Sequence, residues 1–275
     1  MNSKYSLNNE LISFLNNDPE FIKKGFYLGR DSGIYFSVID PRIHSVNVWV
    51  KSNYSFKKKI WKKLSNKIYQ DTATSLDSYV FTNGPFMLPL GNIKNKWMIR
   101  IAYLCPGWGM KPVGVLVHNG VILNHDSVNS PWFGRTGTGS FDNYMIQDTV
   151  PNGAVEGIVG HLIIRNKKII NPTQTSWAAK ASAICCWGLI PHKMPEVGKT
   201  SKFSTNDEQS GIILVAGSNT QTYSIPQKML DVGVTDAIGV DGGTSALMGE
   251  GKNMFFKCKW YKDKIQRYGL FCTKN

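Results

Sequence analysis

The sequence predicts a single α+β domain, built on a mixed, mainly antiparallel sheet with helices packed against it. Two observations predict this class. Of the 275 residues, 42% are hydrophobic and 12% are aromatic, which is enough apolar material for one large core. Strand-like segments outnumber helix-like segments, and the sequence lacks the regular alternation of strand and helix that is typical of a parallel sheet. We find no internal repeat and no linker between domains.

The first part of the chain, residues 1–75, is expected to pack as a helix, a strand pair and a second helix on a core formed by residues 76–275. Ser6 to Asn16 has the apolar spacing of a short helix. Ser55 to Gln70 has an apolar residue at every fourth position, which predicts an amphipathic helix with lysines on its other faces. These lysines fit a contact with an anionic surface, and they fit an ordinary solvated face as well.

Strands are predicted where β-branched and aromatic residues cluster between turn residues. Gly33 to Asp40 and His44 to Lys51 are separated by a short turn, so we expect them to form an antiparallel pair. The other predicted strands are Tyr79 to Thr82, Trp97 to Leu104, Val113 to His118, Gly157 to Ile164, Ala181 to Trp187, Ile212 to Ala216 and Ala237 to Val240.

The formal net charge of +13 indicates an anionic partner, because a summed positive field raises the local concentration of negative molecules. A surface that is merely solvated by many lysines explains the same number. The sequence has no helix-turn-helix, zinc-finger or RNP-like motif, so nucleic acid is not favoured over an anionic small molecule.

The sequence predicts a cytoplasmic protein that needs no metal and no cofactor. It has no run of about 18 apolar residues and no leader typical of a signal peptide, so we expect no membrane association. The five cysteines have no CxxC spacing and are expected to be free thiols. The histidines lack the spacing of a preformed metal cluster, and no Gly-x-Ser-x-Gly motif points to acyl chemistry.

The segment Ala237 to Met248 carries the clearest chemical signal. A buried strand runs directly into Asp241, two glycines and two hydroxyl residues. Glycines allow a ligand to approach the backbone, and successive N–H groups there can bind an anion. The residues that would do so are Gly242, Gly243, Thr244 and Ser245. A tight turn that Asp241 caps is the alternative interpretation.

Three features near the C-terminal end resemble the signature of the phosphodiester glycosidase family: the strand at Gly211 to Gly217, the helix that begins at Ser224 and ends at Gly233, and the loop at Asp236 to Ser245. Weaker matches lie upstream in the same order as in that family. They are Thr82 to Phe86, Pro112 to Leu123, and Glu156 to Ile170. The resemblance implies a hydrolase that cleaves the bond between a sugar and a phosphodiester.

The resemblance and the chemistry together suggest a set of site residues. Asp241 and Glu156 are the carboxylates that would activate water or stabilise a positive sugar ring. The donors for the phosphate or the leaving group would be Lys180 and His161, beside the backbone of residues 242–245. Asn83, followed by Gly84, would orient a sugar hydroxyl, and Arg135 lies in a glycine-rich loop that could touch a phosphate.

Each of these residues also has a structural alternative. Glu156 and Lys180 can be ordinary residues near strand ends, the loop around Arg135 can be an ordinary surface loop, and His161 can be structural. Lys180 stands where the family has arginine, and Thr244 where it has a third glycine. These two departures motivate a second function, a non-catalytic binder that captures a phosphorylated sugar or nucleotide signal in the same pocket.

Overall fold

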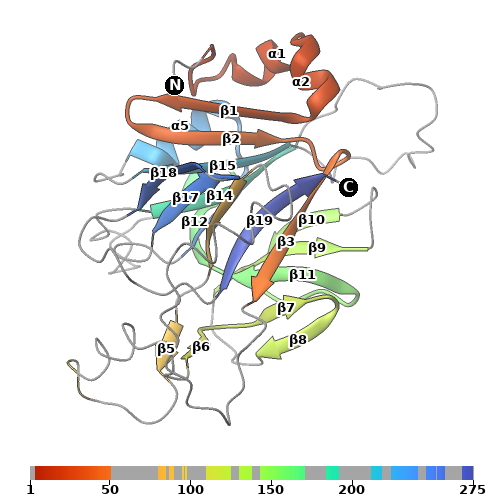
Figure 1. Cartoon of the computed structure of the whole chain (residues 1–275), viewed down its shortest axis with the longest axis vertical. Coiled ribbons are helices and arrows are strands. Elements are labelled where there is room, and N and C mark those ends of the chain that lie inside the picture. Colours follow the sequence, from red (N-terminus) through yellow and green to blue (C-terminus); the bar gives the residue numbers. More distant parts are fainter. Residues whose placement is uncertain are drawn as a thin grey trace.

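The computed structural model describes fourteen parts of the chain, and strands dominate them (Figure 1). The described residues are 4–50, 80–84, 87–89, 95, 97, 110–124, 130–137, 143–170, 184–191, 212–218, 224–240, 246–251, 253–257 and 268–274. These strands form three large sheets and one two-stranded sheet, and every strand pair in this part of the chain is antiparallel.

The first sheet has seven strands in the order β1-β2-β15-β14-β16-β12-β13. It joins strands that lie far apart in the sequence, because β2 pairs with β15 and β12 pairs with β16. The strands are β1 (Phe26–Asp31), β2 (Ile34–Ile39), β15 (Ile212–Ser218), β14 (Ile184–Ile190), β16 (Asp236–Gly239), β12 (His161–Arg165) and β13 (Lys168–Ile169).

The second and third sheets have five strands each, in the orders β18-β17-β4-β19-β3 and β10-β9-β11-β7-β8. The second contains β18 (Asn253–Lys257), β17 (Leu247–Glu250), β4 (Val80–Asn83), β19 (Tyr268–Lys274) and β3 (His44–Val50). The third contains β10 (Asn143–Gln147), β9 (Trp132–Thr136), β11 (Ala154–Val159), β7 (Leu116–His118) and β8 (Val121–Asn124). The small sheet pairs β5 (Met87–Pro89) with β6 (Met110–Pro112).

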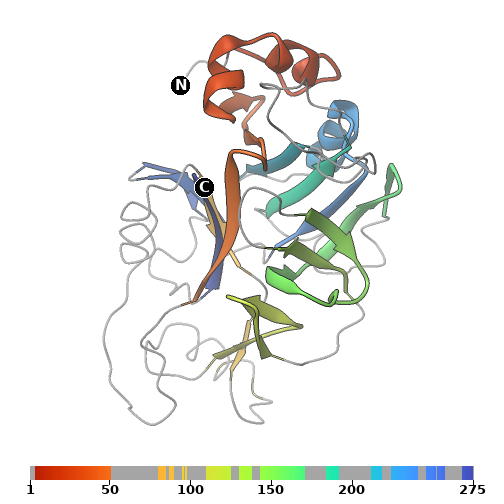
Figure 2. The same ribbon diagram turned by 90° about the vertical axis from the view of Figure 1, so that its right-hand side faces the viewer.

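One large hydrophobic cluster contains side chains from all three sheets. It includes Ile213 and Trp187 of the first sheet, Val48 of the second and Phe133 of the third. Figure 2 shows the second and third sheets on two sides of this interior. The cluster therefore holds the three sheets in fixed relative positions, because close-packed side chains tolerate little displacement.

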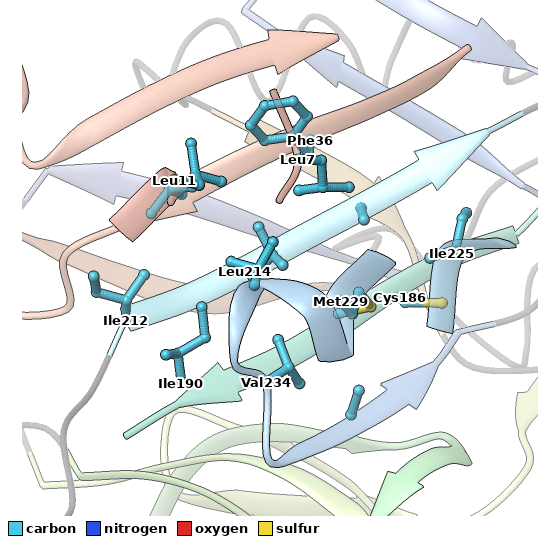
Figure 3. Close-up of a cluster of buried hydrophobic side chains, with 14 of the residues drawn as sticks. Leu7, Leu11, Phe36, Cys186, Ile190, Ile212, Leu214, Ile225, Met229 and Val234 are labelled. Atoms are coloured by element: carbon cyan, nitrogen blue, oxygen red, sulfur yellow. The ribbon is translucent and has the colours of Figure 1, made fainter. Parts of the chain in front are cut away.

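The outer face of the first sheet is covered by short helices. These are α1 (Leu11–Asn16), α2 (Pro19–Lys24) and α5 (Ser224–Val232). A second hydrophobic cluster lies beneath them, in which Leu7 and Leu11 pack near Phe36 while Met229 of α5 packs near Cys186 (Figure 3). The predicted helix is confirmed as α5, which ends at Val232, directly before Gly233, whose φ of +105° suits glycine.

The prediction of an α+β fold was wrong. In the described residues the fold is mainly antiparallel β, with helices of only six, six and nine residues. The helix expected from Ser6 to Asn16 is shorter than predicted, since α1 begins only at Leu11. A second short helix, α2, follows it and is capped by Asp18. The amphipathic helix expected at 55–70 lies outside the described residues, as do most of the expected strand 97–104 and the expected boundary at residue 75.

Two strand predictions also need correction. The strands at 34–39 and 44–50 exist, but they do not pair: β2 joins the first sheet and β3 joins the second. In the turn between them, the buried carboxylate of Asp40 accepts hydrogen bonds from Arg42. After this turn, β3 pairs with β19 of the second sheet instead of with β2. The single strand expected at 157–164 is divided at Gly160 into β11 and β12, which belong to different sheets. Among the described residues, no helix has the length and apolar character of a membrane span.

Candidate functional site

Several strands of the first two sheets end around the segment 241–245. β16 leads through Val240 into this segment, and Ala246 and β17 follow it. The Val240 amide donates to the Cys185 carbonyl over 3.0 Å, which fixes the start of the segment against β14. The Leu247 amide donates to the Oδ1 of Asn83 over 3.2 Å, which fixes its end against β4. We call Asn83, Cys185, Val240 and Leu247 the loop frame.

Asn83 is fully buried at the end of β4. In addition to the bond from Leu247, its Nδ2 donates to the carbonyl of the buried Gly84 over 3.4 Å. The neighbouring Thr82 hydroxyl accepts from Trp187 Nε1 and donates to the Asn83 carbonyl, each over 3.0 Å. The Asn83 side chain thus binds Leu247, two residues after the predicted loop.

Cys185 belongs to the frame, although no motif in the sequence singles it out. Its thiol donates to the Leu247 carbonyl over 3.2 Å, while its own carbonyl accepts from Val240. Val240 and Leu247, which flank the segment 241–245, are thereby both bonded to one residue. Complete burial raises the pKa of the Cys185 thiol, so this sulfur stays protonated and acts as a structural donor.

His161 lies at the start of β12, directly opposite Gly239 in the register. It is therefore next to the strand that leads into residues 241–245. Burial lowers the pKa of His161 to about 4, so the imidazole is neutral near pH 7. The preceding Gly160 is required by packing, because a Cβ there would lie 2.5 Å from Ile238 Cδ1. A neutral imidazole can donate a hydrogen bond to a phosphate, but it adds no positive charge.

The remaining predicted residues of this site are Asp241, Gly242, Gly243, Thr244, Ser245 and Lys180, and all six lie outside the described residues. Their described neighbours are fixed: Val240 and Ala246 are buried on the two sides of the loop, and Ile184 is buried four positions after Lys180.

Glu156 lies elsewhere, on β11 of the third sheet. Its Oε2 accepts from the Val48 amide over 2.9 Å and lies 3.1 Å from His118 Nδ1. Its Oε1 accepts from the Asn119 amide over 2.9 Å. The carboxylate is almost completely buried, with 3% of the residue exposed. These bonds account for both oxygens without a ligand, and they join the β7–β8 hairpin to β3.

Arg135 has a similar position on β9, opposite Glu156 in the register. Its guanidinium donates to the Val46 carbonyl over 3.2 Å, to the Gly137 carbonyl over 3.1 Å and to Asn47 Oδ1 over 3.0 Å. The Tyr144 hydroxyl of β10 accepts from the Val46 amide over 2.7 Å. We call Arg135, Tyr144 and Glu156, with the β3 groups that they bind, the seam.

The seam provides hydrogen-bond partners for backbone groups at the unpaired edge of β3. β3 is the last strand of the second sheet, and alternate residues of an antiparallel strand turn their N–H and C=O groups away from the paired neighbour. Val46 and Val48 are such residues, and side chains of the third sheet satisfy their exposed groups. β19 lies between β3 and β4, so the seam is at least about 10 Å from Asn83 at the usual strand spacing.

In the described part of the chain, no three His, Cys, Asp or Glu residues are grouped as metal ligands. Nothing in this part of the chain tests the expectation that the protein needs no metal or cofactor.

The chain is similar to known proteins in its fold but not in its sequence. The sequence matches no protein-family model and no curated protein. The fold is similar to the catalytic domain of zebrafish N-acetylglucosamine-1-phosphodiester alpha-N-acetylglucosaminidase, solved auto-inhibited by its pro-peptide. That match has a TM-score of 0.53 and 14% identity, and it covers 91% of this chain and 82% of that one.

A Burkholderia pseudomallei protein, provisionally named as exported, is also similar. It has a TM-score of 0.54 and 9% identity, with coverage of 87% of this chain and 73% of that one. At these identities the likeness establishes the fold alone. One distant structural neighbour is thus a glycosidase that acts on a phosphodiester. The cytoplasmic location of this protein stays a prediction, since the other neighbour is named as exported.

Proposed function

We propose that this protein is a hydrolase that cleaves the bond between a sugar and a phosphodiester in an anionic substrate, with the active site at residues 241–245. One observation carries the proposal. Described residues from β4, β14, β16 and β17 bind one another around both ends of this segment. The glycines and hydroxyl residues of this segment are the types that bind an anion through backbone N–H groups, and fixed flanking residues would favour such a site.

Asp241 is the proposed catalytic carboxylate. It directly follows the buried Val240, so its backbone begins at a fixed point of the frame. Its negative charge would stabilise the positive sugar ring of the transition state or activate the attacking water. The amides of Gly242, Gly243, Thr244 and Ser245 would hold the phosphate, and the positive charge of the whole chain would attract it.

His161 and Lys180 are the proposed additional donors. His161 is neutral near pH 7, so it would donate a hydrogen bond rather than a proton to the leaving oxygen. A hydrogen bond suffices there, because a departing phosphate monoester has a second pKa of about 6 and is a far better leaving group than an alkoxide. Lys180 is four residues from the buried Ile184, a separation of at most about 14 Å of extended chain.

Glu156 does not enter this mechanism as a reacting group. The paired carboxylates of glycosidases lie roughly 5 to 9.5 Å apart across the scissile bond, and both must reach the substrate. The Glu156 carboxylate is instead enclosed in the seam, where its oxygens accept bonds from Val48 and Asn119. The Arg135 guanidinium likewise donates to Val46, Asn47 and Gly137. The proposed site therefore rests on Asp241 as its carboxylate.

The test is to incubate the protein with a panel of sugar 1-phosphodiesters that differ in sugar and aglycone, and to measure both the released sugar and the melting temperature. We expect release of the free sugar from at least one member. If no member of the panel is hydrolysed and none raises the melting temperature, the proposal is wrong.

The second function, a non-catalytic binder of a phosphorylated sugar or nucleotide, rests on Lys180 and Thr244, which differ from the catalytic family at two proposed contact positions. The same experiment separates the two functions. A ligand that raises the melting temperature and is recovered intact after prolonged incubation identifies the binder.

A further inference from the structure

β8 is a free edge of the third sheet, and it exposes three neighbouring apolar side chains (Figure 1). Val121, Ile122 and Leu123 follow one another along this strand and are 57%, 40% and 48% exposed. Consecutive apolar residues place apolar side chains on both faces of a strand, which is typical of a strand that is enclosed on both faces. Among the described strands, β8 pairs with β7 alone, so its other side is unpaired.

The other five edges of the three large sheets each contain or bind a charged side chain. β1, β13 and β18 each include a basic residue. Glu156 and Arg135 bind the backbone of β3, and Arg165 donates to the Ile146 carbonyl of β10 over 3.1 Å. No Lys, Arg, Asp or Glu occurs from Pro112 to Asn124, which includes β8. Charges at a sheet edge oppose pairing with another chain, and β8 lacks this protection.

The hairpin that carries β8 is held in place by the rest of the protein. The Asn119 amide in its turn donates to Glu156 Oε1 over 2.9 Å. At the other end of β8, Asn124 Nδ2 donates to the carbonyls of Pro112 and Gly114, over 2.9 and 2.6 Å. A strand that is already fixed can pair with another strand without the entropic cost of ordering itself.

The chemistry of β8 suits a second copy of the same chain. Val121 pairs with His118 across the turn, so Ile122, the next residue, turns its N–H and C=O groups to the free edge. A two-fold axis beside Ile122 would place the two Ile122 residues opposite each other, with Val121 and Leu123 on either side. These contacts are all between aliphatic side chains, and no like charges are opposed at this edge, although each copy has a net charge of +13.

We propose that β8 pairs in antiparallel fashion with β8 of a second copy and so joins the third sheets of two copies into one sheet. The strand has four residues, and a bulge at Leu123 limits the regular pairing. A contact of this size falls short of the roughly 800 Å² per partner of a stable interface, so the dimer should be weak. Added salt should strengthen it, because salt screens the repulsion between two copies of charge +13.

The test is sedimentation equilibrium of the whole protein at concentrations up to about 1 mM, in about 50 mM and about 500 mM salt. We expect an equilibrium of monomer and dimer that shifts to the dimer at the higher salt concentration. Ile122→Lys should weaken the dimer by about tenfold or more, because it places two like charges opposite each other. Ile169→Lys is the matched control, since Ile169 is 38% exposed on β13 and the change in residue and charge is the same.

Cross-linking gives a second measurement that does not add charge. In the proposed pair the two Ile122 Cα atoms are about 5.5 Å apart, which is within the range of a disulfide. Ile122→Cys should therefore form a linked dimer in oxidised glutathione, and Ile169→Cys should form no more than the unaltered protein does. A protein that stays monomeric at about 1 mM in high salt would overturn the pairing. Equal dimerisation of Ile122→Lys and Ile169→Lys would overturn it as well.

Discussion

The loop frame and the seam both contain polar residues that the sequence suggested as site residues, but the two regions use them differently. In the seam, Glu156 and Arg135 bind backbone groups of β3, and their charges are directed at the protein itself. In the frame, Asn83 and Cys185 are neutral and hold the two ends of a segment whose own residues carry the proposed chemistry. A buried charge near a strand is therefore a poor guide to catalysis unless its partners are known.

The energetic reason is the high cost of leaving polar groups unpaired. A buried N–H or C=O group without a partner costs about 1 to 3 kcal/mol, so the free edge of β3 requires donors and acceptors. Charged side chains supply them strongly, which explains why the seam uses Glu156 and Arg135. The frame needs only to fix a backbone, and neutral groups do this without placing a negative charge beside the proposed phosphate site.

The largest expected effect is a loss of turnover, without a loss of folding, when Asp241 loses its charge. Asp241→Asn should fold normally and lose turnover by a factor on the order of 100 or more, because the amide keeps the size of the side chain but removes the charge that serves the transition state. The measurement is kcat on the substrate identified from the panel, with Asp231→Asn on the exposed side of α5 as the matched control. Full activity in a folded Asp241→Asn protein would remove this residue from the mechanism.

The opposite pattern is expected at the seam. Glu156→Gln replaces one acceptor by an amide that faces the N–H of Val48 or Asn119, so it should lower the free energy of unfolding by about 2 to 4 kcal/mol. The folded fraction should keep its kcat. Urea unfolding and single-turnover rates measure the two effects, with the exposed Glu10→Gln as control. A stable variant that has lost its activity would return Glu156 to the catalytic site.

These two regions also show what the sequence could and could not predict. Local features were predicted well: α5 begins at Ser224 and ends before Gly233, and β16 runs into the proposed loop as expected. The predicted strand that ends at His118 is followed by a turn at Asn119 and Gly120, with positive φ values of 51° and 74°. Such features depend on neighbouring residues, so the local pattern contains them.

Partners that lie far apart in the sequence were not predictable from it. The pattern at 34–50 predicts two strands correctly, but β2 pairs with β15 and β3 with β19, whose residues lie more than 150 positions away. Glu156 binds Val48 across 108 positions. Nothing in the sequence near Glu156 indicates that the edge of β3 lies beside it, and the structural alternative for this residue could not be decided without the fold.

A smaller effect concerns the titration of His161. Its folded-state pKa of about 4 lies below the value of about 6.5 expected in the unfolded chain, so the unfolded state binds more protons between these two pH values. The free energy of unfolding should therefore fall as the pH falls from about 6.5 to 4, by roughly 2 to 3 kcal/mol, and this contribution should be constant above pH 7.

His161→Gln should flatten this part of the pH profile. His44, whose pKa is also lowered by burial, lies on β3 and serves as the comparison, because His44→Gln should remove a separate part of the slope. Asp18 contributes at lower pH, since its pKa is held at about 2 by hydrogen bonds from Lys4 and Tyr5. An unchanged slope in His161→Gln would show that this imidazole is not buried beside the frame.

The smallest expected effect is a change in ligand affinity when Lys180 is replaced by alanine or by arginine. If its ammonium binds the substrate phosphate, Lys180→Ala should weaken affinity roughly tenfold, since it removes one charge-assisted contact worth about 1.5 kcal/mol. Lys180→Arg should keep most of the function or improve it, because the guanidinium can bind two phosphate oxygens. Neither change should lower the free energy of unfolding by more than about 1 kcal/mol. Ligand affinity and melting curves, compared with Lys23→Ala on the exposed side of α2, measure both properties. If Lys180→Ala binds as tightly as the unaltered protein, the positive charge at the loop comes from elsewhere, and the correspondence between Lys180 and the arginine of the catalytic family does not hold.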